Sequence, residues 1–301
     1  IGDIDKIEGN AVKSVLIPTL DKLKKTALYI RIKAHGIVVG LPDDTDMGNS
    51  EVGHNAFGAG RVFAQGAKLV NKSIESGSLF RGEVWNNLIN NCKANNSKLH
   101  FLGLFSDGNV HSNISHLKAM IIKAAELGIK DICVHILLDG RDVGETSALE
   151  YVDPFEEFIK ETNSKYNVNC RIASGGGRMK ITMDRYEADW NMVKLGWDTH
   201  IHGNARKFRS AREAIETYRK EINGVIDQDL PAFVIVNDAG EPLGKVTDGD
   251  SFIFFNFRGD RAIEISKAFE MDDFDKFDRG KRPKVMYAGM MEYDGDAHIP
   301  K

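Results

Sequence analysis

From about residue 83 onward, apolar runs of strand length alternate with longer segments whose apolar residues recur at helical spacing. Strands are expected over 99–105, 132–138, 169–173, 232–236, 251–257 and 285–287. Helices are expected over 84–92, 114–124, 148–162, 186–195, 211–222 and 260–269. This alternation is typical of an α/β domain with a largely parallel sheet.

Two residues modify these expected helices. Ser112 stands just before the helix over 114–124 and is the expected N-cap, since a hydroxyl can accept a hydrogen bond from a free backbone N–H there. Pro154 lies inside the helix over 148–162 and is expected to interrupt or shift it, because proline lacks a backbone donor.

The pattern before residue 83 is less regular. A short amphipathic helix is expected to begin near Pro18, and β-forming residues over 27–39 predict a strand that ends in the turn Gly40-Leu41-Pro42. A further helix is expected over 61–74.

The segment 46–61 concentrates a hydroxyl, an imidazole, two amides and four glycines. Glycines let the backbone turn sharply and approach a ligand closely. Ser50 stands where this loop gives way to a possible helix, so its hydroxyl could cap that helix or act as an activated nucleophile. The segment alone leaves both roles open.

Four loops that follow apolar strands combine polar or glycine-rich sequence with an arginine or a histidine. They are Ser106–Ser112, Asp139–Val143, Ser174–Arg178 with Met183–Arg185, and Asn256–Arg261. Each loop alone is compatible with a solvated salt bridge. The carboxyl ends of parallel strands meet at one sheet edge, however, and arginine offers a planar fork of donors to phosphate and carboxylate. Together the loops predict a site for a small, multiply anionic ligand.

Composition narrows the possible functions. The 301 residues suggest about two domains, and a formal net charge of −4 gives no overall basic field for nucleic acid. No apolar run approaches the ~18 residues of a membrane span. The three cysteines show no metal-ligand spacing and indicate reduced thiols of a cytoplasmic protein.

The sequence lacks the residue patterns of a catalytic metal site and of a nucleotide-binding P-loop. His135 lies inside an apolar strand, which favours a hydrogen-bonded core histidine. No HxxxH or carboxylate–histidine cluster supplies a complete catalytic metal site. The glycines at 175–177 are not followed by the Lys-Ser/Thr of a P-loop, so a nucleoside triphosphatase is excluded.

Taken together, these motifs resemble the 2,3-bisphosphoglycerate-independent phosphoglycerate mutases. Residues 40–61 resemble the nucleophile segment of that family, and the four loops resemble its substrate-binding motifs. The stretches 287–290 and 293–295 resemble the segment before its second hinge. The longer motifs at 173–179 and 183–187 are similar to those of the plant and trypanosomatid type.

The resemblance implies a role for each matched residue. Ser50 would be the phosphorylated nucleophile and a ligand of one of two divalent metal ions, manganese or magnesium. The residues that would bind phosphoglycerate are His111, Arg141, Asp142, Arg178, Arg185, Arg258 and Arg261. The implied reaction interconverts 3-phosphoglycerate and 2-phosphoglycerate in glycolysis and gluconeogenesis, in a monomeric, cytoplasmic isomerase with no nucleic-acid or membrane partner.

The resemblance also implies a division of the chain. Residues 1–69 would belong to an alkaline-phosphatase-like domain, 70–296 to a transferase domain and 297–301 to the start of the second hinge. Against the family pattern, the N-terminal strand with its metal-binding aspartate and the C-terminal metal ligands are missing from residues 1–301. The chain alone is therefore expected to be inactive and not to hold both metals.

Two alternatives remain open at this point. One is a metal-dependent phosphatase or phosphopentomutase of the same superfamily. The other is a non-catalytic segment that binds phosphoglycerate.

Overall fold

The computed structural model describes residues 6–301, which divide into two compact units, one ending at Ala34 and one spanning His35–Lys301. The first unit contains α1 (Ala11–Ser14) and α2 (Pro18–Thr26). Pro18 begins α2, as predicted, because proline needs no backbone donor in the first helical turn. The domain boundary at 69/70 stays a prediction.

The strand predicted over 27–39 is wrong. Residues 28–36 have no helix or strand, and Ile37–Val39 form the 3₁₀-helix η1. The β-forming side chains of Leu28 and Ile30 are 108% and 82% exposed. No strand within residues 6–301 pairs with this segment. A strand is stable only when neighbours satisfy its backbone and cover its apolar face.

The second unit begins with helices that precede the sheet. They are α3 (Ser50–Ala59), α4 (Gly66–Glu75), α5 (Ser78–Arg81) and α6 (Glu83–Asn95). The helix predicted over 61–74 begins later, at Gly66, because buried Gln65 makes tertiary contacts. Its side-chain amide donates to the Val39 and Val52 carbonyls, 3.2 and 3.4 Å away.

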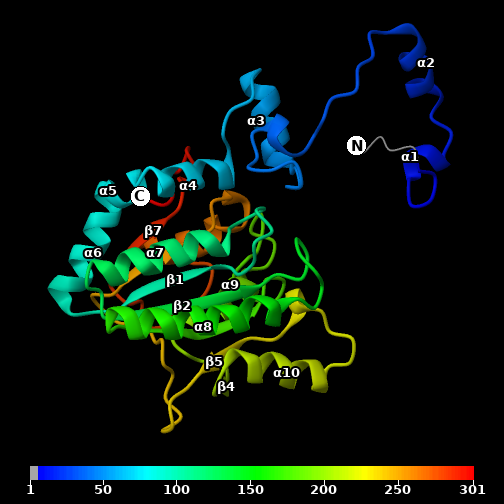
Figure 1. Ribbon diagram of the computed structural model, residues 1–301. Helices are drawn as coiled ribbons and strands as arrows, with labels where there is room; N and C mark the ends of the chain where they lie inside the picture. Colours follow the sequence, from blue (N-terminus) through cyan, green and yellow to red (C-terminus); the bar gives the residue numbers. More distant parts are fainter. Residues whose placement is uncertain (1–5) are drawn as a thin grey trace. The chain divides into compact units, whose positions relative to one another are not determined.

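Seven strands form one sheet, in the order β4-β5-β3-β2-β1-β6-β7 (Figure 1). Their bounds are β1 Leu99–Leu104, β2 Asp131–Leu138, β3 Asn169–Gly177, β4 Arg206–Phe208, β5 Phe233–Ile235, β6 Ser251–Phe254 and β7 Met286–Gly289. Every pairing is parallel except β3 with β5. The predicted α/β class with a largely parallel sheet is confirmed.

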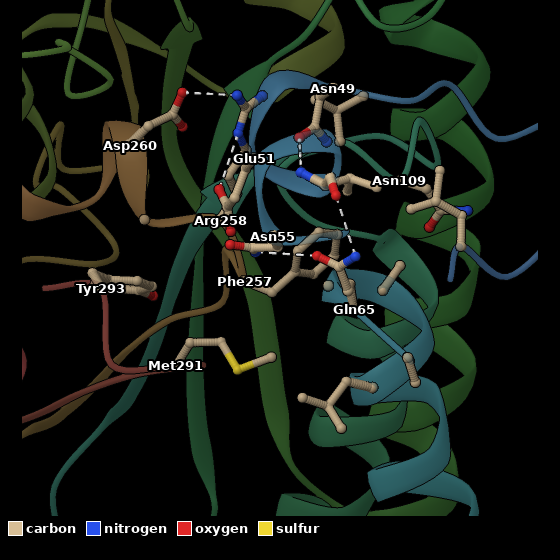
Figure 2. A pocket seen from close by; sticks show the side chains of 18 of the residues that line it. Asn49, Glu51, Asn55, Gln65, Asn109, Phe257, Arg258, Asp260, Met291 and Tyr293 are labelled. Carbon is tan, nitrogen blue, oxygen red and sulfur yellow. Dashed lines mark hydrogen bonds and ion pairs between the residues drawn. The ribbon is translucent and has the colours of Figure 1, made fainter. Parts of the chain in front are cut away.

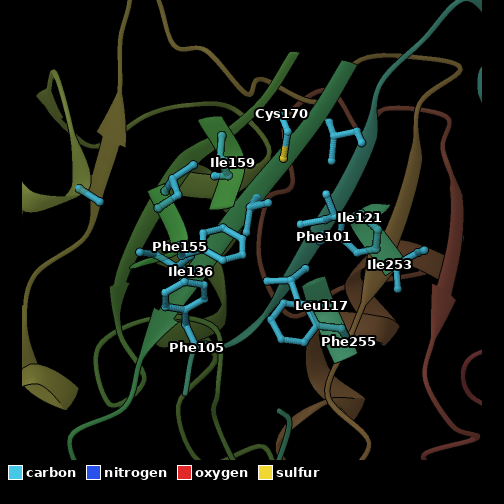
Figure 3. Packing of buried hydrophobic residues seen from close by; sticks show 14 of the residues in the cluster. Phe101, Phe105, Leu117, Ile121, Ile136, Phe155, Ile159, Cys170, Ile253 and Phe255 are labelled. Atoms are coloured by element: carbon cyan, nitrogen blue, oxygen red, sulfur yellow. The ribbon is translucent and has the colours of Figure 1, made fainter. Parts of the chain in front are cut away.

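Helices cover both faces of the sheet. They are α7 (Ile114–Glu126), α8 (Ala148–Tyr166), α9 (Trp190–His200), α10 (Ala211–Glu221) and α11 (Ile263–Glu270), with the 3₁₀-helices η2 (Asp227–Asp229) and η3 (Gly259–Arg261). Residues of α6, α7, α8 and α10 share one buried apolar cluster with the sheet, and those of α9 and α11 share another. Figure 3 shows the first cluster, in which Phe105 meets Phe155 edge-on with ring centroids 4.9 Å apart. No helix within residues 6–301 combines the length and apolar content needed to cross a membrane.

Two expectations about these helices are corrected. Pro154 lies inside α8 without ending it. Asn113, not Ser112, caps α7 by accepting a hydrogen bond from Ser115 N at 2.8 Å. Ser112 instead donates to the Leu104 carbonyl, so its hydroxyl ties the loop back to β1.

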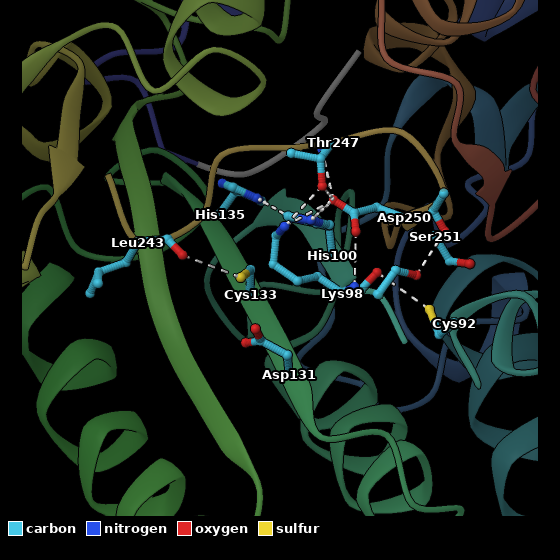
Figure 4. A network of polar contacts seen from close by, with 12 residues as sticks. Cys92, Lys98, His100, Asp131, Cys133, His135, Leu243, Thr247, Asp250 and Ser251 are labelled. Carbon is cyan, nitrogen blue, oxygen red and sulfur yellow. Dashed lines mark hydrogen bonds and ion pairs between the residues drawn. The ribbon is translucent and has the colours of Figure 1, made fainter. Parts of the chain in front are cut away.

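A chain of buried polar side chains crosses the sheet (Figure 4). His100 Nε2 lies 3.1 Å from Asp250 Oδ2, and His100 Nδ1 lies 3.0 Å from His135 Nε2. His135 Nδ1 then lies 2.6 Å from Ser174 Oγ, which lies 2.7 Å from His200 Nδ1. Burial lowers the pKa of all three histidines, so they are neutral near pH 7. His135 is confirmed as a hydrogen-bonded core histidine.

The proton positions in this chain follow from its acidic end. The Asp250 carboxylate can only accept, so His100 donates to it from Nε2 and accepts at Nδ1. His135 and Ser174 therefore each donate toward Asp250, and His200 donates from Nδ1 to Ser174. Burial alone would raise the pKa of Asp250, but the hydrogen bond from His100 and those from backbone amides lower it.

Candidate substrate-binding site

The four arginine- or histidine-bearing loops converge, as the sequence predicts. Strands β1, β2, β3 and β6 run parallel, so their carboxyl ends share one edge. Arg178, after β3, reaches Asp142 in the loop after β2. His111, after β1, lies 3.5 Å from Asp260 in the loop after β6. An ion pair and a histidine–carboxylate contact thus join loops that are far apart along the chain.

Arg178 is a deeply buried residue of the predicted site, at 2% exposure. Its Nη1 donates to Asp139 Oδ1 at 2.9 Å and to Asp142 Oδ2 at 2.5 Å. Asp139 also accepts hydrogen bonds from the backbone N–H groups of Arg141 and Asp142 and from the Ser106 hydroxyl. Asp139 therefore shapes the loop that carries Arg141 and Asp142.

The loops are built closely enough to require glycine at two positions. Gly140 has φ +68°, a left-handed conformation that side chains disfavour. Gly177 has ordinary dihedrals, but a Cβ on it would lie 2.2 Å from the carbonyl oxygen of Gln228. The backbone just before Arg178 is thereby pressed against η2 and its orientation is fixed.

Asp260 is the centre of a second group of charges. Its Oδ2 lies 3.2 Å from Arg258 Nη2 and 3.4 Å from Arg185 Nε. Arg185 also donates from Nη2 to the Tyr186 hydroxyl at 2.7 Å and lies over the Tyr186 ring. Arg261 is oriented separately, because its Nη1 donates to the Met183 carbonyl at 2.6 Å.

The electrostatics of His111 reflect this concentration of cations. Its ring is 2% exposed, and burial lowers its pKa well below the usual value, followed by the charges of Arg178 and Arg258. The pKa of Arg261 is lowered in turn by burial and by Arg178, with a smaller effect from exposed Arg141. Neutral His111 thus lies among positive charges, as in a site made for an anion.

Ser50 is the first residue of α3, and its neighbour Asn49 is the N-cap, whose Oδ1 accepts from Val52 N at 3.1 Å. The capping role considered for Ser50 is therefore taken by Asn49. The Ser50 hydroxyl is exposed and lies 3.4 Å from Arg258 Nη2. Arg258 Nε lies 3.4 Å from Glu51 Oε2, so one guanidinium joins the start of α3 to the arginine cluster.

A pocket of about 450 Å³ opens beside this contact (Figure 2). Asn49, Glu51, Asn55 and Gln65 line one side, and Arg258 and Asp260 line the other. Arg178, Arg185 and Arg261 are not among its lining residues. Arg258 and Asp260 consequently belong both to the pocket and to the arginine cluster.

Asp139 and Asp260 are the functional residues that sequence reasoning missed. Both stand inside the motifs quoted for the site, directly beside predicted arginines. The available signal was their position after an apolar strand among cations, where a carboxylate is needed to hold guanidinium groups in place.

Comparisons with known proteins identify the family of this chain. Residues 70–295 match the family described as BPG-independent PGAM N-terminus. The chain belongs to the 2,3-bisphosphoglycerate-independent phosphoglycerate mutase family. Its sequence is 58% identical over 293 residues to a probable mutase of this name from Leptospira interrogans, and 49% identical over 294 residues to one from Trypanosoma brucei. These alignments each cover 97% of this chain and 53% of the relative.

A solved structure of a phosphoglycerate mutase from Leishmania mexicana, obtained at low cobalt concentration, is similar in fold. Its TM-score is 0.91 at 48% identity, covering 96% of this chain and 53% of that one. The chain thus spans about half the length of the relatives it matches.

Metal-ligating side chains are expected to be few in this mutase-family chain. The resemblance makes Ser50 the one metal ligand among residues 1–301. Within residues 6–301 no three His, Cys, Asp or Glu side chains form a group that could hold a metal ion. The contact recorded for the Ser50 hydroxyl is with a cation, Arg258.

Proposed function

We propose that this chain supplies the substrate-binding site and the nucleophile of a phosphoglycerate mutase. The reaction would interconvert 3-phosphoglycerate and 2-phosphoglycerate through a phosphoserine on Ser50, in glycolysis and gluconeogenesis. The observation that carries the proposal is the position of the Ser50 hydroxyl, 3.4 Å from Arg258 at the edge of the arginine cluster.

The chemistry needs an anion site beside a nucleophile. In the first half-reaction Ser50 Oγ loses its proton and bonds to phosphorus, while the bond from phosphorus to the 3-oxygen of glycerate breaks and that oxygen takes a proton. In the second half-reaction the 2-oxygen loses its proton and bonds to phosphorus, while the Oγ–P bond breaks and Oγ takes a proton back. The equatorial phosphoryl oxygens must be neutralised throughout, and guanidinium groups suit that role.

The other site residues would hold the glycerate while it turns. Arg141, Arg178, Arg185 and Arg261 would bind carboxylate and phosphate oxygens, and Asp142 would accept hydrogen bonds from hydroxyls. Buried, neutral His111 would orient the bound anion. The reported relatives are named mutases, and nothing in them favours the phosphatase or phosphopentomutase alternative.

The test of the nucleophile uses a protein of the relatives' length that carries this sequence. Ser50→Ala should abolish turnover in an enolase-coupled assay while the protein remains folded by circular dichroism. Asn49→Ser is the matched control, because serine keeps a capping oxygen beside Ser50. Retention of a tenth of the activity by Ser50→Ala would rule out the phosphoserine.

Residues 1–301 alone should give no turnover, because the described residues form no group able to hold a metal ion. Weak binding of 3-phosphoglycerate is expected, since the arginine cluster belongs to a unit that has its own buried apolar core. A coupled assay with excess manganese, beside calorimetric titration with 3-phosphoglycerate, tests both. The metal identity, monomeric state and cytoplasmic location stay predictions.

A further inference from the structure

Asp260 contacts two arginines and a neutral histidine from three separate loops at the sheet edge. His111 comes from the loop after β1, Arg185 from the loop after β3 and Arg258 from the segment after β6. The Asp260 side chain is 13% exposed and carries no role in the proposed reaction.

We propose that Asp260 is a positioning residue for the anion site, fixing Arg185 and Arg258 in the orientation that binds phosphoglycerate. The inference rests on the proposed function, because it names the group that orders the arginines of that same site. Asp260 does not itself need to touch the ligand.

The need for such a group follows from the concentration of positive charge. Arg178, Arg185, Arg258 and Arg261 are close enough to lower the pKa of His111 together, after the larger effect of burial. Long cationic side chains this close repel one another and spread unless fixed charges hold them. Asp139 and Asp142 hold Arg178, and among the described residues Asp260 is the carboxylate paired with Arg185.

The contacts of Asp260 differ from those of an ordinary structural salt bridge. Arg178 donates hydrogen bonds to its two aspartates. In contrast, Arg185 Nε, Arg258 Nε and Asp260 Oδ1 are buried without a hydrogen bond. Arg185 Nε thus faces Asp260 Oδ2 at 3.4 Å without a hydrogen bond, so this attraction is coulombic, whereas Arg258 Nε faces Glu51.

Asp260 can position its neighbours because its own backbone is fixed. A Cβ on Gly259 would lie 2.8 Å from the Tyr293 carbonyl oxygen, so this segment packs directly against residue 293. The buried Tyr293 hydroxyl lies 3.0 Å from the Phe254 carbonyl and 2.7 Å from that of Asn256, to which it can donate. A residue that orients others must be held rigidly.

The positioning role and simple charge repulsion predict opposite changes in ligand affinity for the substitution Asp260→Asn. A carboxylate near an anion site repels the ligand, so removing its charge should strengthen binding if Asp260 merely lies nearby. If Asp260 orients the arginines, Asp260→Asn should weaken binding by about tenfold or more, because Arg185 loses its carboxylate partner and Arg258 keeps only Glu51.

The experiment is calorimetric titration of residues 1–301 with 3-phosphoglycerate and, separately, with inorganic phosphate, at fixed ionic strength. Asp248→Asn is the matched control: it also removes a paired aspartate, one that lies 3.3 Å from Lys281 and outside the site. Thermal unfolding establishes that each variant is folded. If Asp260→Asn does not fold, Asp260→Glu decides, because it keeps the charge and should bind within about threefold of the parent.

Each outcome has a defined meaning. Tenfold weaker binding by Asp260→Asn with unchanged Asp248→Asn supports the positioning role, and equal or stronger binding overturns it, as does a tenfold loss in Asp260→Glu. If the parent binds phosphate but not 3-phosphoglycerate, the proposed substrate is wrong while the phosphate titrations still decide the role of Asp260. If the parent binds neither, both proposals fail.

Discussion

The Nη2 atom of Arg258 lies 3.4 Å from Oγ of Ser50, although 208 positions separate the two residues in the chain. The same guanidinium lies 3.4 Å from Glu51 and 3.2 Å from Asp260. Its side chain is 11% exposed, so these contacts are largely shielded from solvent. The start of α3 is thereby attached to the arginine cluster through one side chain.

Arg258→Lys tests whether this residue acts through the fixed donor geometry of its guanidinium or only through its positive charge. Lysine keeps the charge but cannot donate in two fixed directions, so 3-phosphoglycerate binding should weaken by about tenfold. Calorimetric titration measures the change. Arg209→Lys is the control, because Arg209 is exposed and pairs with Asp238 away from the site. Equal affinity of Arg258→Lys and the parent would mean that charge alone matters.

The buried histidine chain predicts a loss of stability in mild acid. The pKa of His200 falls from 6.5 to about 3 through burial. As the pH falls below 6.5, His200 takes up a proton in the unfolded state but stays neutral in the folded state. Its contribution to stability is therefore complete above pH 6.5 and is lost progressively down to about pH 3. Between pH 7 and pH 5 the loss from this histidine is about 2 kcal/mol.

His200→Asn removes this titration while its amide can still donate to Ser174 in place of Nδ1–H. Urea unfolding at pH 7 and pH 5 should show that the variant loses about 2 kcal/mol less than the parent over this interval. Its stability at pH 7 can be lower without affecting the comparison. The same pH dependence in both proteins would exclude His200 as the cause.

Gly177→Ala should disturb both stability and the site. The added methyl group would meet the backbone oxygen of Gln228 at 2.2 Å, so β3 or η2 must move, at a cost of about 1–3 kcal/mol. Arg178, the next residue, would shift relative to Asp142, and 3-phosphoglycerate binding should weaken. Thermal unfolding and calorimetry measure the two effects.

The matched control is Gly58→Ala, inside α3. A Cβ there meets nothing within 4 Å, and alanine favours a helix over glycine. This variant should be as stable as the parent or more so. If both alanine variants behave alike, the close approach of Gly177 to Gln228 does not limit the fold.

Phe155→Ala should destabilise the protein by about 3–5 kcal/mol, because it empties a fully buried position between Phe105 and Phe158. Phe155→Leu keeps much of the volume and should cost less. Urea unfolding provides the measurement, with Phe57→Ala, 71% exposed, as the control. A loss below 1 kcal/mol in Phe155→Ala would show that the cluster closes around the gap.

The central strands could be predicted from the sequence because they are buried on both faces. Every residue of β1 is buried and all but His100 are apolar or glycine, so the strand can be recognised without knowledge of its neighbours. The edge strand β4 was missed, since only Phe208 of its three residues is buried. The antiparallel direction of β5 could not be predicted either, because direction depends on which strand lies beside it.

Local side-chain chemistry explains a shifted helix boundary. The helix predicted from residue 186 begins at Trp190, where Asp189 caps it by accepting from Asn191 N at 3.0 Å. Tyr186 and Glu187 have φ of +64° and +56°. These left-handed conformations are not helical, and the pattern of apolar residues does not predict them. The hydrogen bond from Glu187 N to buried Glu264 is a tertiary contact that helps to set this conformation.

For the site, the arginines could be predicted because a cation after an apolar strand has a recognisable position. Their partners could not, since the sequence does not say which carboxylate faces which guanidinium. Asp260 shows this most clearly. It stands between Arg258 and Arg261, yet it also lies 3.4 Å from Arg185, which is 75 positions earlier in the chain.

The position of β1 between β2 and β6 has a consequence for synthesis. Leu99 pairs with Ile132 on one side and with Ser251 on the other. At ~5–20 residues per second, β6 emerges roughly 8–30 s after β1. During that interval one edge of a largely apolar strand has its backbone groups free to pair with another chain. A slowing of translation before residue 251 therefore lengthens the period in which the nascent chain is prone to aggregate.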